Sequence, residues 1–347
     1  MRLFSREGRT LGARGTFAVG AVVALAAAAV VAWMLVSPGA GTPSAASRPS
    51  VSISATPAPR SSQTAPASSA PTTGPCSSFS DCGFPDASNT GPRTSPTTLH
   101  AGNLEIRTNG EVVDGWDLHG SLDVYANDVT IEDSSVDSEN WWAVNLRAGY
   151  TGLRILHSAL TGTPGAGPDN GGEDYAVSDM GSGSIEVGWD DISVFGNALS
   201  MGNGFIHDSY VHDPAPFITR SGSYEHVDSV ISDGDDSLGL TIKHNTLLDS
   251  LDIKQGPTSA IGLLPNTGPI QNTTVEDNWL AGGSYALYGG GAGSSNVKVT
   301  GNVFSTQYWP QCGYYGAVAY WNPGGSGNIW SDNEFSSGAP VSPPASD

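Results

Sequence analysis

The segment from residue 207 to residue 254 concentrates the side chains of this sequence that can do acid–base chemistry. Imidazoles and carboxylates transfer protons, and cationic side chains neutralise negative charge that develops on a substrate. The residues of these types in the segment are His207, Asp208, His212, Asp213, Arg220, His226, Asp228, Asp233, Asp235, Asp236, His244, Asp252 and Lys254. From this set we predict His226, Asp228, Lys254 and His207 as catalytic residues.

Two reactions fit these residue types. A polysaccharide lyase needs a base beside a uronate carboxylate, for which Lys254 or His226 is suited, and a cation such as Arg220 to stabilise the resulting charge. A glycoside hydrolase instead needs two carboxylates about 5 to 9.5 Å apart. Asp228 with Asp252 or Asp213 is the pair that the sequence offers for hydrolysis, and the sequence leaves both reactions open.

Three carboxylates in the run "DGDD" are candidates for a Ca²⁺ site, because Ca²⁺ prefers oxygen ligands. They are Asp233, Asp235 and Asp236. The alternative is an ordinary solvated turn. His207 also has an alternative role, since a polar side chain at a turn of the chain can cap backbone groups.

Aromatic residues supply a second signal. The stretch from Gln307 to Pro323, "QYWPQCGYYGAVAYWNP", holds six aromatic side chains. Flat rings suit the faces of sugars and lose little rotamer entropy on binding. The residues predicted to bind substrate are Arg220, Tyr288, Tyr320, Trp321 and Trp309. The alternative is that this stretch packs on itself or shields one end of the fold.

An eight-residue pattern must position these side chains. Mostly apolar residues occupy its first, third and eighth places, and Ser or Asn occupies the sixth. The copies begin at Val129, Leu153, Ile192, Gly204, Leu240, Thr273, Val297 and Asn328. Apolar residues two apart lie on one face of a strand, and the polar residue marks a bend. The sequence therefore predicts an all-β solenoid of stacked coils, in which Asn side chains hydrogen-bond from coil to coil at the bend.

The predicted bend column is irregular at one point. It runs Ser134, Ser158, Asn197, Ser209, Asn245, Asn278, Asn302 and Asn333. Asn197 and Ser209 are too close together for one full coil, so either Ser209 lies off the column or the coil there is split. A longer self-match, of 122–136 with 185–199, supports the chosen register.

Several phrases resemble a known family. "VVDGWDL" at 112–118, the Asn-rich turns, and "CGFPDASNTGP" followed by "TNGEVVDG" are similar to right-handed parallel β-helix proteins of the pectate-lyase-like type, especially secreted actinobacterial members. The resemblance covers residues 82 to 337 and is specific for the fold rather than for an activity. It also implies a site at His226 and Asp228, which match the family's "His-x-Asp-Gly-Ile" phrase, although Ser229 and Val230 depart from it.

Regions outside the repeats have other compositions. We predict a cytoplasmic basic segment at 1–16, a signal anchor or cleaved signal peptide at 17–36, and a disordered Ser/Thr/Pro/Ala linker at 37–75. An N-terminal cap at 76–98 precedes the β-helix domain at 99–337, and a tail follows at 338–347. The long apolar run favours the uncleaved anchor over the cleaved signal. Either alternative places the domain outside the cell, anchored at the surface or secreted. The membrane is then contacted only through the N-terminal segment.

Charge and cysteine content narrow the function. Removing the four Arg and one Glu of residues 1–36 from the totals of 14 basic and 34 acidic residues leaves 10 and 33, a net charge of −23. This strongly negative charge excludes nucleic acid binding, which needs clustered cations.

The three cysteines allow two disulfide pairings. Cys76 can pair with Cys82, or Cys82 can pair with Cys312, and either choice leaves one free thiol. We expect an enzyme acting on a polysaccharide or cell-wall glycan; the alternatives are a non-catalytic glycan-binding or adhesin module and a structural spacer.

Overall fold

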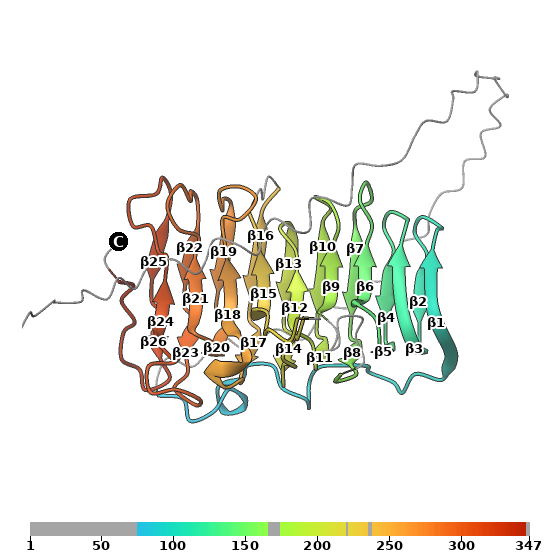
Figure 1. The fold of residues 1–347 in the computed structure, drawn as a ribbon, viewed down its shortest axis with the longest axis horizontal. Helices are drawn as coiled ribbons and strands as arrows, with labels where there is room; N and C mark the ends of the chain where they lie inside the picture. Colours follow the sequence, from blue (N-terminus) through green and yellow to red (C-terminus); the bar gives the residue numbers. More distant parts are fainter. Residues whose placement is uncertain (1–74, 166–173, 220, 235–237, 345–347) are drawn as a thin grey trace, which may run out of the picture. The chain divides into compact units, whose positions relative to one another are not determined.

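The protein forms a stack of parallel β coils. The computed structural model describes residues 75–165, 174–219, 221–234 and 238–344. Within these residues the regular elements are strands and two short 3₁₀ helices, η2 (Ser80–Cys82) and η3 (Ile253–Gln255). Each coil contributes up to three short strands, and equivalent strands of successive coils pair side by side along the stack (Figure 1). The predicted all-β fold with long parallel sheets is confirmed.

Sheet I contains the first strand of each coil. Its nine strands are β2 (Val112–Asp114), β4 (Thr130–Glu132), β7 (Leu153–Leu156), β10 (Ile185–Gly188), β13 (Gly204–His207), β16 (Leu240–Lys243), β19 (Thr273–Glu276), β22 (Lys298–Thr300) and β25 (Ile329–Ser331). Its inward column pairs Ile131 with Ile155, then Val187 and Ile206, all fully buried. Each such side chain contributes about 1.5 to 3 kcal/mol through burial.

Ladder II, half of the larger sheet, follows the bend. It comprises β5 (Ser135–Ser138), β8 (Ala159–Gly162), β11 (Asp191–Ser193), β14 (Tyr210–His212), β17 (Thr246–Asp249), β20 (Trp279–Gly282), β23 (Val303–Phe304) and β26 (Glu334–Phe335). The long strands β1 (Thr98–Ile106) and β3 (Trp116–Val124) pair over their whole length and belong to both halves of this sheet.

Ladder III contains the last strand of each coil. It comprises β6 (Trp142–Leu146), β9 (Tyr175–Asp179), β12 (Asn197–Ser200), β15 (Val227–Ser232), β18 (Pro257–Leu263), β21 (Tyr285–Gly289) and β24 (Gly316–Ala319). All strand pairings between named strands are parallel, as in β10 with β13 and β15 with β18.

The bend between sheet I and ladder II carries the predicted hydrogen-bonded column, with one correction. Backbone N–H groups of Asn245, Asn278 and Asn302 each donate to the side-chain oxygen of the next Asn along the stack, at 3.0 Å. Between Ser158 and Ser209, however, the column residue is Asp190. The placement of Asn197 in the column was wrong, because Asn197 begins β12 in ladder III.

The same correction removes the irregular interval. With Asp190 in place, Ser209 lies on the column and the coil is not split. The self-match of 122–136 with 185–199 was also misleading. Leu122 pairs with Val144 in ladder III, whereas Ile185 pairs with Leu153 and Gly204 in sheet I.

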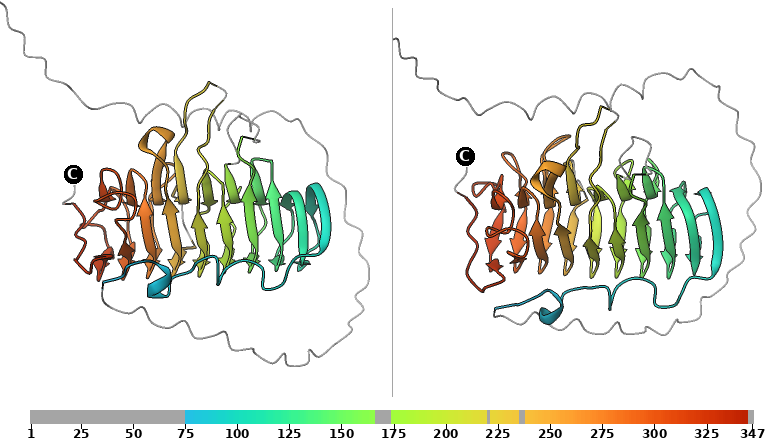
Figure 2. Two further views of the ribbon diagram at one scale, coloured as in Figure 1. Left: turned by 90° about the horizontal axis from the view of Figure 1, so that it is seen from below. Right: turned by 60° about the horizontal axis from the view of Figure 1, so that its bottom comes forward.

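An N-terminal strap, residues 75–97, runs along the coils beneath the stack (Figure 2). Its start bonds the last coil, since Cys76 N donates to Ser336 O, and its end bonds Gly115 O through Thr97 N. Between them, Phe84 packs with Trp279 in a small second core outside the solenoid. The disulfide joins Cys76 to Cys82, and Cys312 is a buried free thiol.

No helix among the described residues has the length and apolar character needed to cross a membrane. The segment predicted as an anchor or signal, 17–36, lies outside the described residues, as do the basic segment before it and nearly all of the predicted linker.

Candidate functional site

The candidate site is a cluster of imidazole and carboxyl groups at the start of β15 in ladder III. The strand register places Asn197, Asp228 and Ser259 side by side on three successive coils. His226 precedes the strand, with its Nδ1 atom 3.6 Å from Asp228 Oδ2 and 3.2 Å from Asn197 Oδ1. Ser259 donates a hydrogen bond to Asp228 Oδ1. The cluster thus brings together His226 and Asp228, the two residues that match the family's sequence phrase.

Exposure differs sharply within this cluster. The Asp228 side chain is fully buried, whereas 49% of the His226 side chain is exposed. Asn197 extends the cluster inward by donating from Nδ2 to Asp174 Oδ1 at 2.8 Å. Asp249, at the end of β17, is a further fully buried carboxyl group, and the charge of Asp228 contributes to raising its pKa. The imidazole of His226 is therefore the part of the cluster that an outside molecule can touch.

Burial sets the protonation of the carboxyl groups. It raises the pKa of Asp174 to about 6, the pKa of Asp228 above its ordinary value, and the pKa of Asp249 well above it. The Asp228 carboxyl group raises the pKa of His226 to about 9, against the opposing effect of burial. The arrangement is therefore a cationic imidazole that faces outward, backed by carboxyl groups whose ionised forms are penalised by burial.

Polar atoms in the cluster lack partners. Asp228 Oδ2, Asp249 Oδ2 and Ser229 Oγ are buried without a hydrogen bond to any described residue. Buried polar atoms are nearly always paired in native proteins, and exceptions concentrate at functional sites. These atoms therefore set this corner of ladder III apart from the hydrogen-bonded asparagines of the bend column.

A tyrosine-lined cavity lies farther along the same ladder. Ile231, Gly262 and Tyr288 are aligned on neighbouring strands. A side chain at Gly262 would contact both Asp228 Oδ1 and Ser259 Oγ, so these atoms lie on the same side of the ladder as Tyr288. Burial, followed by the Asp228 charge, raises the pKa of Tyr288 above its ordinary value. The cluster and the cavity therefore share one wall.

The cavity has a volume of about 670 Å³. Its aromatic lining is a chain of contacting rings, with centroids of Tyr285 and Tyr288 5.6 Å apart and those of Tyr288 and Tyr320 5.4 Å apart. Tyr315 and Tyr320 are each 57% exposed. Exposed rings beside a cavity of this size suit the apolar faces of sugar residues.

The two predicted tryptophans do not line this cavity. Trp321 is buried in the core, where its ring contacts that of Trp330 at 5.3 Å. Trp309 packs edge-on against Tyr314 at 5.0 Å. Of the predicted substrate-binding residues, Tyr288 and Tyr320 are the pair that the cavity brings together.

Lys254 is exposed on η3, whose first turn is capped by the Asp252 side chain. The next turn of chain adjoins the cluster, since Val227 N donates to Gly256 O at 3.0 Å. The Lys254 ammonium group has no hydrogen bond or ion pair with a described residue. Asp252 thus caps a helix, and Lys254 lies at the margin of the cluster.

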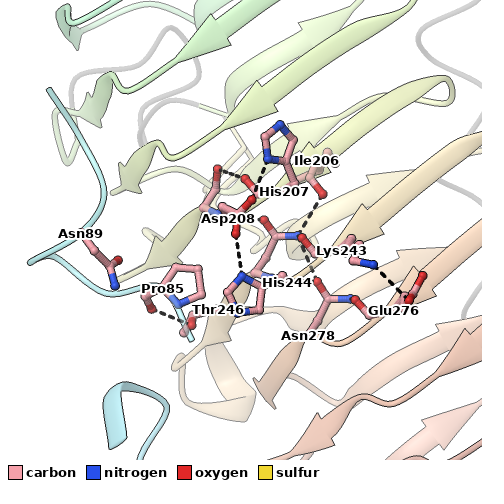
Figure 3. A network of polar contacts seen from close by, with 12 residues as sticks. Pro85, Asn89, Ile206, His207, Asp208, Lys243, His244, Thr246, Glu276 and Asn278 are labelled. Atoms are coloured by element: carbon pink, nitrogen blue, oxygen red, sulfur yellow. Dashed lines mark hydrogen bonds and ion pairs between the residues drawn. The ribbon is translucent and has the colours of Figure 1, made fainter. Parts of the chain in front are cut away.

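His207 lies elsewhere, at the end of β13 in sheet I. Its Nδ1 is 2.9 Å from Asp208 Oδ2, and Asp208 Oδ1 is 2.6 Å from Nδ1 of His244 (Figure 3). Only 5% of the His207 side chain is exposed. Burial alone would lower the pKa of His207, but Asp208 and Glu186 outweigh it and raise that pKa to about 9.

The His207 network has the features of a structural ion-pair group. The strap covers its margin, since Phe84 stacks on His244 with centroids 5.6 Å apart and Pro85 O accepts from Thr246. His207 is therefore not part of the wall that carries His226 and Asp228.

Of the three predicted Ca²⁺ ligands, the structure describes Asp233. Asp233 Oδ1 accepts a hydrogen bond from Asn266 Nδ2 at 2.8 Å. Asp235, Asp236 and Arg220 lie outside the described residues.

Sequence reasoning missed Asp174, Ser259 and Asp249 as members of the cluster. No motif marks them, because they reach Asp228 only through the pairing of coils. The repeat pattern did include Asn197, but it placed this residue in the bend column.

Comparison with known proteins identifies no relative: no family model, no curated protein and no solved structure matches this chain. The functional conclusions therefore depend on the site itself.

Proposed function

We propose that this protein is an extracellular carbohydrate-active enzyme that cleaves a long glycan along the outer wall of ladder III. The observation that carries the proposal is the shared wall: Asp228, Gly262 and Tyr288 bring the imidazole–carboxyl cluster beside the tyrosine cavity. Sugar rings stacked on Tyr288 and Tyr320 would extend toward His226. The resemblance to pectate-lyase-like β-helix proteins supports the coiled scaffold on which this wall is built, not the activity itself.

Hydrolysis is the reaction that the cluster supports better than elimination. A hydrolase needs a proton donor for the leaving oxygen of the glycosidic bond. The half-exposed His226, whose pKa is raised to about 9 beside Asp228, is the acid of the cluster that can reach this oxygen, and the carboxyl groups of Asp174, Asp228 and Asp249 are buried behind it. Elimination would instead use the exposed Lys254 as the base.

The Cys76–Cys82 disulfide supports a location outside the cell, because disulfides persist in oxidising compartments. The predicted anchor and linker at 17–36 and 37–75 support a domain held at the cell surface. We propose cell-wall or other surface glycans as substrates.

The test is turnover of a panel of plant, algal and bacterial glycans by the full-length protein. New reducing ends without an unsaturated product indicate hydrolysis, and an unsaturated, ultraviolet-absorbing product indicates elimination. We expect His226→Ala and Asp228→Asn to reduce turnover by about 100-fold or more, the usual contribution of a positioned acid or base. Tyr288→Ala should weaken glycan binding, whereas Tyr125→Ala, on a distant coil, should change neither binding nor turnover.

A second candidate is a non-catalytic glycan-binding module. The observation that favours it is the complete burial of Asp228 and Asp249, which keeps both carboxyl groups from direct contact with a substrate. Glycan binding that needs Tyr288, with no product from any glycan, would establish this alternative and refute the enzyme. Collapse of the thermal melt in His226→Ala would show that this residue serves the fold instead.

A further inference from the structure

Three side chains converge on the outer side of ladder II at the first coils, away from the proposed glycan wall. Asp117 and His119 lie two residues apart on β3 and so point to the same side. His119 is aligned with Asp137 on the neighbouring strand β5. One nitrogen and two carboxylate oxygens from this group all lie within 4.8 Å of one another.

Neither ring nitrogen of His119 forms a hydrogen bond, although both lie near carboxylates. His119 Nε2 is 3.8 Å from Asp117 Oδ1, and Nδ1 is 3.5 Å from Asp137 Oδ2, so neither contact is a hydrogen bond. The side chain is 62% exposed. Both nitrogens thus face carboxylates without bonding to them.

His212, on the same outer side four coils along, is the internal comparison. Its nitrogens form contacts of 2.8 Å with Asp213 and 2.9 Å with Asp191, and its side chain is only 17% exposed. The residue types are the same as around His119, but every nitrogen of His212 is engaged. The donor atoms of the His119 group lie close together without bonding to one another, whereas the His212 imidazole is hydrogen-bonded at both nitrogens.

The positions around the His119 group offer no compensating cation. The strand register aligns Asp117 and His119 with Leu99 and Ala101 on β1, and Asp137 with Thr161 on β8. No Lys or Arg occupies these aligned positions. Two carboxylates are therefore left with a single imidazole between them, an arrangement that attracts a divalent cation.

We propose that Asp117, His119 and Asp137 form a binding site for a divalent transition-metal ion such as Zn²⁺ or Co²⁺. One imidazole and two carboxylates suit these borderline ions, whereas Ca²⁺ and Mg²⁺ take oxygen ligands alone. Ligands at about 2.0 to 2.2 Å from Zn²⁺ stand closer together than 4.8 Å, so the exposed side chains close by about 1 Å on binding. Water completes the coordination.

Equilibrium dialysis of the full-length protein against Zn²⁺, with Co²⁺ absorption as a second readout, tests this site. We expect one more ion bound to the wild-type protein than to His119→Ala at the same free Zn²⁺ concentration, and at least about a 10-fold weaker affinity in Asp117→Asn and Asp137→Asn. Asp213→Asn, which alters the hydrogen-bonded His212 group, is the matched control, and this variant should keep the ion.

Zn²⁺ should raise the melting temperature of the wild-type protein and of Asp213→Asn but not that of His119→Ala, because a ligand stabilises only the state that binds it. Equal Zn²⁺ binding by the wild-type protein and His119→Ala would overturn the proposal. So would binding of Ca²⁺ in preference to Zn²⁺, because the imidazole would then have no role.

Discussion

Asp190 occupies a position that Asn fills in four later coils. It is fully buried, and its Oδ1 accepts from Ser158 N at 2.6 Å, but its Oδ2 has no partner among the described residues. Asn245, in contrast, uses its amide nitrogen to donate to Asn278 Oδ1 and to two backbone carbonyls. Burial raises the pKa of Asp190 well above its ordinary value, because the ionised carboxylate is poorly solvated there.

We predict that Asp190→Asn stabilises the protein by about 1 to 2 kcal/mol at neutral pH, because an amide restores the missing donor. Because the pKa of Asp190 is higher in the folded state than in the unfolded chain, its contribution to stability is full below about pH 4 and is lost as pH rises toward the folded-state pKa. The advantage of the variant should therefore be larger at pH 7 than at pH 4. Urea unfolding at both pH values measures it; a variant less stable at both would contradict the assignment.

At the scale of elements, the shortest connection from ladder III to sheet I joins β12 to β13. Only residues 201–203 separate the two strands, and Gly204 begins β13 with a φ of 129°. A Cβ atom at this position would meet the carbonyl oxygen of Ile185 on the paired strand β10. Glycine is therefore required here both by its backbone conformation and by the close approach of the preceding coil.

We predict that Gly204→Ala destabilises the protein by about 3 kcal/mol, through strain at positive φ combined with displacement of a paired strand. The control is Gly110→Ala, where φ is 71° but no atom lies within reach of an added Cβ. That variant should cost only about 1 to 2 kcal/mol. Thermal melts of both variants provide the measurement, and equal losses would show that the contact between coils is unimportant.

At the scale of the whole described domain, the strap links coils that are distant in sequence. It bonds the last coil at Ser336 and the first coils at Gly115, and Arg93 forms an ion pair with Asp133 along the way. Phe84, only 1% exposed, fills the second core against Trp279. The strap therefore covers apolar side chains of ladder II that would otherwise face water.

We predict that Phe84→Ala costs about 3 kcal/mol or more and loosens the strap before the coils unfold, because the lost ring leaves a cavity under a single segment of chain. Limited proteolysis should then cut within 75–97 faster than in the wild-type protein, and the emission of Trp279 should shift to longer wavelength. Leu99→Ala is the control, since this side chain is 74% exposed. Unchanged proteolysis in Phe84→Ala would show that the strap is held by its polar contacts alone.

The sequence by itself determined the all-β solenoid and most of the bend column, whereas the choice between the two possible disulfides was left to the structure. These features are local: alternation of apolar residues and a polar residue at a bend are read within eight positions, whatever the rest of the chain does. The pairing of His226 with Asp228 was likewise accessible, because the two residues lie on one short segment.

Only the tertiary structure decided that Asp190 rather than Asn197 belongs to the column and that His207 is separated from His226. It also decided that Asp174, Asp249 and Ser259 join Asp228, and that His119 meets Asp137. The reason is physical: which residues face one another across coils depends on the length of every intervening loop and on strand register, and a shift of one residue reverses the side on which a side chain lies.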